Sequence, residues 1–356
     1  MAPDEREAMT ISVPEKIKKF ISDGKDKQAS DVHITANTPV MYRIGKKLSR
    51  ASHGEVPPEL AKELCYSLLT EDQVRQFEHS HDIDFMLGDE DGRYRVNISM
   101  NNGFVGAVIR LLPQRPWGLA DLKLPPIVKE LTHRTKGLVL ITGSTGQGKT
   151  TTMSAMIDEI NHAERKHIIT IEDPVEAVHD NDKSIIRQRE VGRDTESFPR
   201  ALRAALRQDP DVIAVGEMRD YETIRIALTA AETGVLVFST LHVISIDKII
   251  ERLISYSPPE EEGHIRNLLA DCLQGIIHQE LLPTRQRVKR VATEILIASD
   301  AVRNIVRRRG TFMLRSIIQT GARLGMMSMV QSVNALLEEG AIELDAAEAV
   351  LFNYAM

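Results

Sequence analysis

The sequence has little cysteine, few aromatic residues and no long apolar run. Its two cysteines, Cys65 and Cys272, are too few for a disulfide framework and fit no zinc-ligand spacing such as C-x-x-C. Aromatic residues make up 4% of the chain, which excludes an aromatic-rich platform for stacking bases. No stretch reaches the roughly 20 apolar residues that cross a bilayer. These absences predict a reduced, cytoplasmic protein that touches a membrane only at its surface.

The chain also has no excess of positive charge. The formal net charge is −6, so the chain has no overall electrostatic reason to bind nucleic acid. Residues 1–7 are charged and are not followed by an apolar segment, so we expect no secretory signal. The 356 residues, 42% of them hydrophobic, are typical of two or three globular domains.

Residues 1–112 predict an α+β domain. Apolar spacing predicts helices over residues 13–27 and 57–69, and Thr70-Glu71-Asp72-Gln73 matches a capping box at the start of a third. Strands are expected over residues 32–34 and 40–44, with three more around the alternating stretch 94–100. The simplest assembly is an antiparallel sheet with helices on one face.

Prolines and glycines crowd residues 113–126 and predict a linker. From residue 127 to 356, strands and helices alternate at first, which predicts a mostly parallel sheet covered on both faces. The expected strands are 137–142, 167–172, 212–215 and 235–241, and the expected helices are 149–163, 199–207 and 222–232. After about residue 258 we expect mainly helix, capped at Ser257 to Glu260, with only residues 291–297 resembling a strand.

A phosphate-binding loop is the strongest motif. Residues 143–150, Gly-Ser-Thr-Gly-Gln-Gly-Lys-Thr, fit G-x-x-x-x-G-K-[ST] between an apolar strand and an amphipathic helix. The backbone N–H groups of such a loop bind phosphate, Lys149 reaches the β and γ phosphates, and the Thr150 hydroxyl binds Mg²⁺. ATP and Mg²⁺ are therefore the expected cofactors. The predicted nucleotide-binding residues are Ser144, Thr145, Gly146, Gln147, Gly148, Lys149, Thr150 and Thr151.

Candidate catalytic residues follow two of the predicted strands. Glu217 ends the apolar run 212–216, at the strand end where open α/β sheets bind ligands, and is the candidate for orienting the attacking water. His242 ends the run 239–242 and is a candidate sensor of the γ-phosphate. The alternative for Glu217 is a helix cap or salt bridge, and for His242 a structural histidine.

The segment Ile-Glu-Asp-Pro-Val-Glu at residues 171–176 supplies further carboxylates after another strand. The usual Asp-Glu pair is Gly216-Glu217 here, so the magnesium shell needs help from this second strand end. Glu172 and Asp173 are therefore predicted to join Thr150 at the metal, and Glu176 is a candidate catalytic residue. Structural salt bridges are the alternative.

Several blocks together resemble one family. Four of them are similar to the Walker A, Asp-box, atypical Walker B and His-box motifs of type II/IV secretion and pilus ATPases: residues 143–150, 171–176, 211–220 and 240–242. Three more resemble the type IV pilus retraction ATPases of twitching motility: residues 29–34, 222–234 and 301–307. The similarity spans roughly residues 13–350.

The resemblance implies a homo-hexameric ring. Each subunit would join an N-terminal PAS-like domain, through the linker, to a RecA-like P-loop ATPase domain with a helical tail. In that family nucleotide lies between the two domains, and N-terminal arginines close onto the phosphates. By motif position these are Arg95 and Arg110; solvent-facing strand positions are the alternative.

The resemblance also implies partners and a place in the cell. The ring would act in the cytoplasm, bound peripherally to the inner membrane, on a membrane platform protein of the pilus. A paralogous retraction ATPase is a second possible partner.

Three functions stay open. A retraction motor is favoured, because residues 278–294 lack the four-cysteine metal module common in extension and secretion relatives. An accessory paralogue or an extension-type ATPase is the alternative; Val235, where the family usually has a second histidine, favours the accessory paralogue. A DNA translocase rests only on Arg307-Arg308-Arg309, and such a short basic run is usually a solvated helix end.

Overall fold

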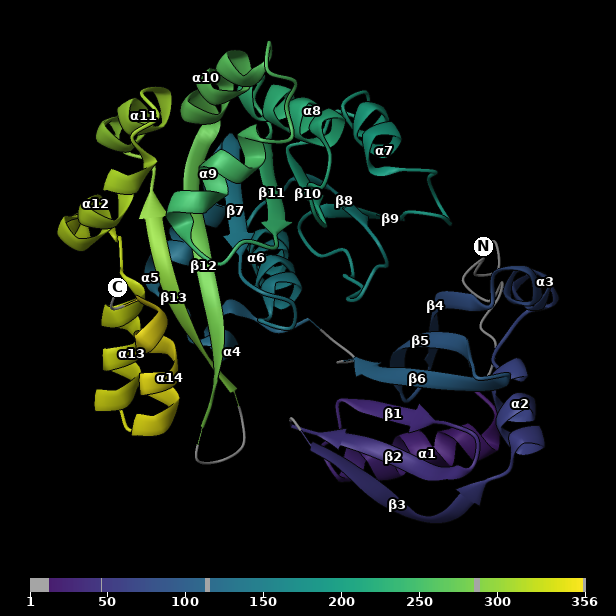
Figure 1. Cartoon of the computed structure of the whole chain (residues 1–356). Helices are drawn as coiled ribbons and strands as arrows, with labels where there is room; N and C mark the ends of the chain where they lie inside the picture. The colour runs from purple at the N-terminus through teal and green to yellow at the C-terminus, as the bar shows by residue number, and fades with distance from the viewer. Residues whose placement is uncertain (1–12, 46, 113–115, 285–288, 355–356) are drawn as a thin grey trace. The chain divides into compact units, whose positions relative to one another are not determined.

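The computed structural model describes residues 13–45, 47–112, 116–284 and 289–354. The chain forms two compact units, residues 1–115 and 116–356, which we describe separately (Figure 1). The division falls within the proline-rich stretch, whose residues 113–115 lie outside the described part. The rest of that stretch includes helix α4 (Leu119–Leu122) and the start of α5 (Pro126–Thr132). Leu119 and Leu124 of this stretch pack against the core of the second unit.

The first unit is a six-stranded antiparallel sheet in the order β3-β2-β1-β6-β5-β4. The antiparallel sheet, the three helices and the capping box at Thr70 and Gln73 are confirmed; β3 was not predicted. The elements are α1 (Glu15–Asp26), β1 (Asp31–Ile34), β2 (Thr38–Ile44), β3 (Lys47–Val56), α2 (Pro58–Tyr66), α3 (Glu71–Ser80), β4 (Asp82–Asp89), β5 (Gly92–Asn101) and β6 (Phe104–Leu112).

One face of this sheet is buried under the helices. Tyr94, Val96 and Ile98 alternate along β5 and share one apolar core with Ile17 of α1 and Phe77 of α3. Because successive strand residues point to opposite faces, the residues between them belong to the other face. The unit therefore has one covered face and one face available for polar side chains.

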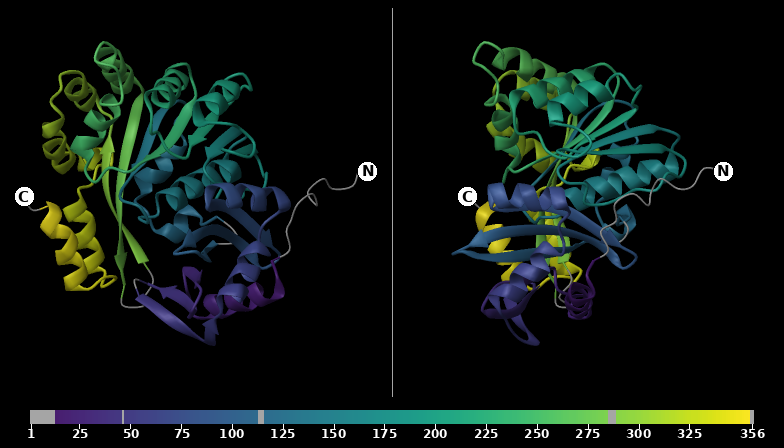
Figure 2. Two further views of the ribbon diagram at one scale, coloured as in Figure 1. Left: turned by 45° about the vertical axis from the view of Figure 1, so that its right-hand side comes forward. Right: turned by 90° about the vertical axis from the view of Figure 1, so that its right-hand side faces the viewer.

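The second unit is a seven-stranded sheet in the order β13-β12-β7-β11-β10-β8-β9, parallel except for β13. Helices lie on both faces (Figure 2), as predicted, and β7, β10 and β11 are buried along their whole length. The elements that build the sheet are β7 (Gly137–Thr142), α6 (Lys149–Ala163), β8 (His167–Glu172), β9 (Ile185–Glu190), α7 (Phe198–Ala205), β10 (Val212–Val215), α8 (Tyr221–Glu232), β11 (Leu236–Leu241), α9 (Ile246–Ile254), α10 (Glu262–Cys272), β12 (Leu273–Pro283) and β13 (Lys289–Ile297).

The later part of this unit differs from the sequence prediction. The expectation of helix was wrong for β12, which pairs with both β7 and β13. Its apolar residues come in two pairs, Ile276-Ile277 and Leu281-Leu282, without the alternation that identifies a strand. The edge strand β9 was not predicted either. The expected cap at Ser257 was also wrong, because α10 begins at Glu262 after Glu261.

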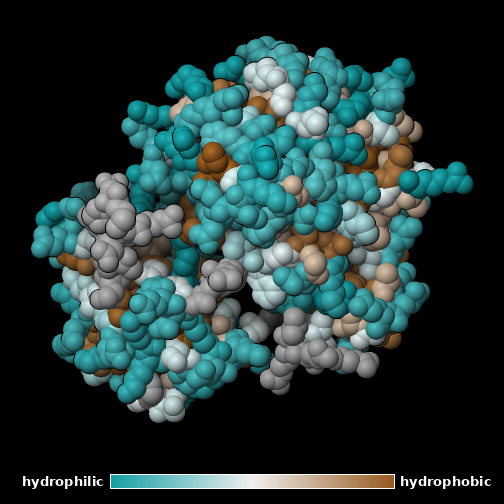
Figure 3. Space-filling view, turned by 180° about the vertical axis from the view of Figure 1, so that it is seen from behind, coloured by the Kyte–Doolittle hydropathy of each residue, from teal (hydrophilic) through white to brown (hydrophobic). Residues whose placement is uncertain are grey.

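Helices make up the C-terminal end, as expected. The pair α13 and α14 packs in a small apolar cluster with the outer ends of β12 and β13, represented by Leu282 and Ala292. Within the described ranges, none of the helices is both long and apolar enough to span a membrane. The surface in Figure 3 is mostly hydrophilic, with apolar side chains in small groups. The tail elements are α11 (Asp300–Arg307), α12 (Leu314–Thr320), α13 (Met329–Glu338) and α14 (Leu344–Tyr354), with two short 3₁₀ turns.

Candidate nucleotide site

The phosphate-loop motif joins the end of β7 to the start of α6, as predicted. Gly146 and Gly148 have φ near +80°, in the left-handed region that favours glycine. A side chain at Gly143 would place its Cβ 2.5 Å from the carbonyl oxygen of Gln279. Glycine is therefore required both for the curl of the loop and for its close approach to β12.

Lys149 is held inside this loop. Its ammonium donates hydrogen bonds of 2.9 Å to the carbonyl oxygens of Gly143 and Ser144, and the residue is only 6% exposed. Burial lowers the pKa of Lys149, and the negative charge of Glu217 partly opposes this shift. The cation is thus fixed within the motif whose backbone N–H groups bind phosphate.

Strand β12 braces the loop from the neighbouring side. The buried Gln279 side chain donates from Nε2 to the carbonyl oxygen of Gln147 over 2.6 Å, and the Leu281 N–H donates to Gln147 Oε1 over 2.6 Å. Sequence reasoning missed these residues because it placed no strand there. The available signal was the polar run His278-Gln279-Glu280 between two apolar pairs, since polar groups that become buried need hydrogen-bond partners.

A hydrogen-bonded chain continues from this strand to the C-terminal helix. His278 Nδ1 lies 3.0 Å from Thr142 Oγ1, and its Nε2 lies 2.8 Å from the hydroxyl of Tyr354, which donates to Glu280 Oε1 over 3.0 Å. Because the tyrosine proton goes to Glu280, the Tyr354 oxygen accepts from Nε2–H, and Nδ1 accepts from Thr142. Burial lowers the pKa of His278 to about 4, so the ring is neutral. The last helix is thus tied to the residue preceding the phosphate loop.

The predicted residues at the ends of β10 and β11 meet Lys149. His242 Nδ1 lies 3.2 Å from Lys149 Nζ, and His242 Nε2 lies 3.3 Å from Glu217 Oε2. An ammonium can only donate, so Nδ1 accepts and Nε2–H donates to the carboxylate. Partial burial, followed by the charge of Lys149, lowers the pKa of His242 and keeps this neutral form. Arg219 forms an ion pair with the other oxygen of Glu217.

The carboxylates after β8 lie at the same edge of the sheet. Glu172 is buried, and its Oε1 accepts from Thr170 Oγ1 over 2.6 Å and from Gln188 Nε2 over 3.3 Å. Asp173 is exposed and Glu176 is half-buried, both in the connection that leads to β9.

This donor set fits Mg²⁺ bound together with a nucleotide. In the described part of the chain, no three His, Cys, Asp or Glu side chains gather as a metal-binding group. Mg²⁺ prefers oxygen ligands and commonly takes one or two from protein, with phosphate oxygens and water completing its shell. The Thr150 hydroxyl and a carboxylate at residues 172–173 supply oxygens of the required kind.

Arg95 and Arg110 lie in the first unit, directly opposite one another on β5 and β6. Both occupy the face that the helices leave uncovered, since they alternate with the buried Val96 and Ile109. Arg110 Nε donates to the buried Asp31 over 2.9 Å, and Arg95 Nε lies 3.7 Å from a carboxylate oxygen of Asp84. The structure brings the two arginines together within this unit.

A cavity of about 700 Å³ adjoins the start of α6. Gly148 and Thr151 line it, so two predicted nucleotide-binding residues border both the loop and the cavity. Its volume is within the usual range for small-molecule sites. The other lining residues, which the sequence did not reveal, include Trp117, Leu122, Leu281, Arg290 and Glu339.

Two of the three arginines at residues 307–309 have partners within the unit. Arg307 forms an ion pair with Asp271, and Arg309 lies 3.7 Å from Glu262. These contacts hold two of the three side chains against α10. They agree with the interpretation of this run as a solvated helix end.

Comparison with known proteins gives one consistent result. The family model for type II/IV secretion system proteins matches residues 6–339. A type IV pilus retraction ATPase, PilT, from Pseudomonas aeruginosa is 41% identical over 320 residues, covering 90% of this chain and 93% of that protein. A twitching motility protein from Neisseria gonorrhoeae is 41% identical over 321 residues, covering 90% and 86%.

A solved structure agrees over nearly the whole chain. The crystal structure of the pilus retraction motor PilT with bound ADP has a TM-score of 0.83 and 42% identity, covering 93% of this chain and 95% of that one. The α/β fold, the intact phosphate loop and the similarity to these relatives together assign the chain to a family. It belongs to the type II/IV secretion system protein family, among the type IV pilus retraction ATPases.

Proposed function

We propose that the chain is a motor ATPase that hydrolyses ATP to drive type IV pilus retraction. The observation that carries this proposal is the line of contacts from Lys149 through His242 to Glu217. It joins the phosphate loop to a carboxylate at the end of a parallel strand, where open α/β sheets bind their ligands. The retraction function is supported by the similarity to PilT.

In the proposed reaction, water attacks the γ-phosphorus and the bond to the β-phosphate oxygen breaks. Lys149 and the backbone N–H groups at the start of α6 neutralise the phosphates. Glu217 orients the attacking water, and His242 links that carboxylate to the lysine beside the γ-phosphate. Thr150, with Glu172 or Asp173, would hold Mg²⁺, which would supply positive charge to the phosphates.

Arg95 and Arg110 would complete the charge stabilisation. Guanidinium groups that reach the transferred phosphoryl group stabilise its developing charge. Their present carboxylate partners would be exchanged for phosphate oxygens. Glu176 stays a candidate for a supporting catalytic role.

The cavity beside α6 would take the nucleoside. Gly148 and Thr151 place it next to the phosphate loop, and the Trp117 ring, half exposed in this cavity, offers a surface for stacking a base. The bound ADP in the similar PilT structure supports nucleotide binding at this fold.

The proposed assembly is a homo-hexamer of subunits with a PAS-like first unit and a RecA-like second unit. It would act in the cytoplasm, peripheral to the inner membrane, on a pilus platform protein. A paralogous retraction ATPase would be an additional partner.

The test is surface pilus number and twitching in cells whose only copy carries Lys149→Ala. Excess pili without movement is the expected result, because pili would still extend but not retract. Cells without pili would contradict retraction and indicate an extension ATPase. Normal pili and movement would indicate an accessory paralogue.

A further inference from the structure

The connection between β8 and β9, residues 173–184, runs beside α6. Parallel strands are usually joined by a helix that crosses from one edge of the sheet to the other, but this described segment has no regular helix or strand. It starts at the edge that carries the phosphate loop, and it ends where the Ile185 N–H meets the Lys166 carbonyl oxygen. Helix α6 crosses the sheet in the same direction.

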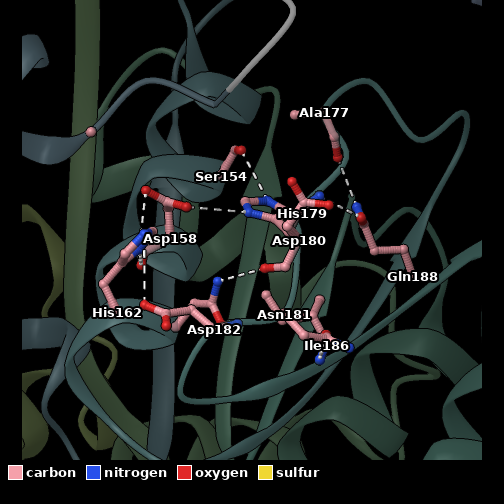
Figure 4. Close-up of polar contacts among 12 residues, drawn as sticks. Ser154, Asp158, His162, Ala177, His179, Asp180, Asn181, Asp182, Ile186 and Gln188 are labelled. Carbon is pink, nitrogen blue, oxygen red and sulfur yellow. Dashed lines mark hydrogen bonds and ion pairs between the residues drawn. The ribbon is translucent and has the colours of Figure 1, made fainter.

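Contacts between the two segments occur in matching order (Figure 4). In the middle of α6, Ser154 Oγ lies 3.1 Å from His179 Nε2, and Asp158 Oδ1 lies 3.8 Å from His179 Nδ1. Further along, Asn161 Nδ2 donates to the Asp180 carbonyl oxygen over 2.8 Å, and the Asp182 N–H donates to Asn161 Oδ1 over 3.1 Å. The later part of the connection, residues 179–183, is therefore held against α6.

The fastened face of α6 begins at the proposed metal ligand. Thr150, Ser154, Asp158 and His162 are four residues apart and share one face of the helix. Since His179 is opposite Ser154 and Asp158, the earlier residues of the connection extend toward Thr150. These earlier residues include Asp173, directly after Glu172.

We propose that His179 is a positioning residue, which sets the register of the acidic connection against α6 and so holds the carboxylates of residues 172–173 at Thr150 for Mg²⁺. This inference rests on the proposed function. It adds to that function a residue that touches neither the metal nor the nucleotide.

The chemistry of His179 suits this role. Its side chain is only 2% exposed, and burial lowers its pKa and keeps the ring neutral, although Asp158 opposes the shift. The neutral ring accepts from the Ser154 hydroxyl at Nε2 and directs Nδ1–H toward the Asp158 carboxylate. The His179 side chain thereby faces two residues of the helix that are one turn apart.

Gln188 on β9 fixes the other side of the connection. Its Oε1 accepts from the His179 N–H over 2.9 Å, and its Nε2 donates to the Ala177 carbonyl oxygen over 2.7 Å and to Glu172 Oε1 over 3.3 Å. The glutamine therefore joins His179 directly to one of the proposed metal carboxylates. A shift of His179 would be transmitted to Glu172.

The test is a Mg²⁺ titration of the purified full-length chain bound to a fluorescent ADP, with ADP affinity in EDTA measured in parallel. In His179→Ala, the Mg²⁺ concentration at half-saturation is expected to rise about tenfold, the usual effect of losing a residue that orients metal ligands. Affinity in EDTA is expected to stay within about twofold. His179→Asn should restore most of the Mg²⁺ affinity, because its amide N–H can face Asp158.

Two more variants keep the test decisive. Ser154→Ala removes one hydroxyl from the same contact and should raise the half-saturating Mg²⁺ about threefold, even if His179→Ala unfolds. Lys183→Gln is the control, because this side chain is exposed at the far end of the connection; it should change neither the Mg²⁺ titration nor the ADP affinity.

Unchanged Mg²⁺ titrations in the folded His179 and Ser154 variants would overturn the inference. A loss of ADP affinity in EDTA as large as the rise in half-saturating Mg²⁺ would also overturn it. The substitution would then have weakened nucleotide binding itself, not the placing of the metal carboxylates. A wild-type chain that binds no nucleotide would instead contradict the proposed function.

Discussion

The two units hold their positive charges in opposite ways. In the second unit, Lys149 is 6% exposed, bonded to two loop carbonyls and surrounded by strand ends. In the first, the Arg110 side chain is 54% exposed and that of Arg95 34%, on a sheet face without helices. Under the proposed function, nucleotide binding would therefore depend on a fixed, buried cation, whereas the arginines are accessible groups that could exchange partners.

The sheets explain this contrast. A parallel sheet is buried on both faces, so its polar residues gather at the strand ends, where Glu217 and His242 lie. An antiparallel sheet can leave one face to solvent, and Arg95 and Arg110 use that face. Replacing the buried lysine should therefore weaken binding, whereas replacing the accessible arginines should mainly slow catalysis.

Lys149→Ala should have the largest effect. Removing the buried ammonium takes away the charge that faces the phosphates, so we expect hydrolysis to be lost and ADP affinity to fall about 100-fold or more. Titration with a fluorescent ADP measures the second effect. The exposed Lys248, replaced by alanine, is the control; wild-type affinity in Lys149→Ala would contradict a fixed binding site in this unit.

Glu217→Gln should separate binding from hydrolysis within the second unit. The amide keeps the shape of the side chain but cannot orient water as a carboxylate does, so turnover should fall about 1,000-fold. ADP affinity should stay within about threefold, since the binding groups remain. Retained turnover in a phosphate-release assay would rule out this residue as the water-orienting group.

Replacing Arg95 and Arg110 together by alanine tests the role of the accessible arginines of the first unit. We expect kcat to fall about 100-fold, because the transition state loses guanidinium charge, with ADP affinity changed less than about threefold. Arg75→Ala is the matched control, since Arg75 pairs with Asp72 at the surface of the same unit. A loss of affinity equal to the loss of kcat would show that these arginines are binding groups.

The pH dependence of stability should depend on His278, a buried histidine of the second unit. The pKa of His278 is lowered from 6.5 to about 4 in the folded chain, so the unfolded chain binds more protons between these values and stability falls as pH falls below 6.5. Between pH 6.5 and 5 the loss is about 2 kcal/mol. Urea unfolding of wild type and His278→Gln at several pH values measures this loss of stability. If the free energy of unfolding changed equally with pH in both, another group would be responsible.

Tyr354→Phe should have the smallest effect. It removes the hydroxyl that joins His278 to Glu280, and a lost hydrogen bond of about 1 kcal/mol should weaken ADP binding about fivefold. Tyr256→Phe, which keeps the ring stacked on Arg252, is the control. Unchanged affinity in Tyr354→Phe would show that the C-terminal helix does not support the phosphate loop.

The sequence predicted the groups that depend on local order. Lys149 was predicted from the phosphate-loop motif, and Glu217 and His242 from their places at the ends of apolar runs, so each prediction needed only the local sequence. It could not predict Gln279 or Tyr354, because the Gln147 and Gln279 contact joins residues 132 positions apart. Such contacts depend on β12 lying beside β7, which the sequence of β12 does not indicate because it lacks the alternation of a strand.

Steady-state phosphate release by the purified chain, supplied with ATP and Mg²⁺, measures ATP hydrolysis at this site. We expect sustained release over many turnovers, lost on chelation of Mg²⁺ and in Lys149→Ala. Tight nucleotide binding without repeated turnover would contradict it, because the chain would then be a nucleotide-regulated partner and not a motor.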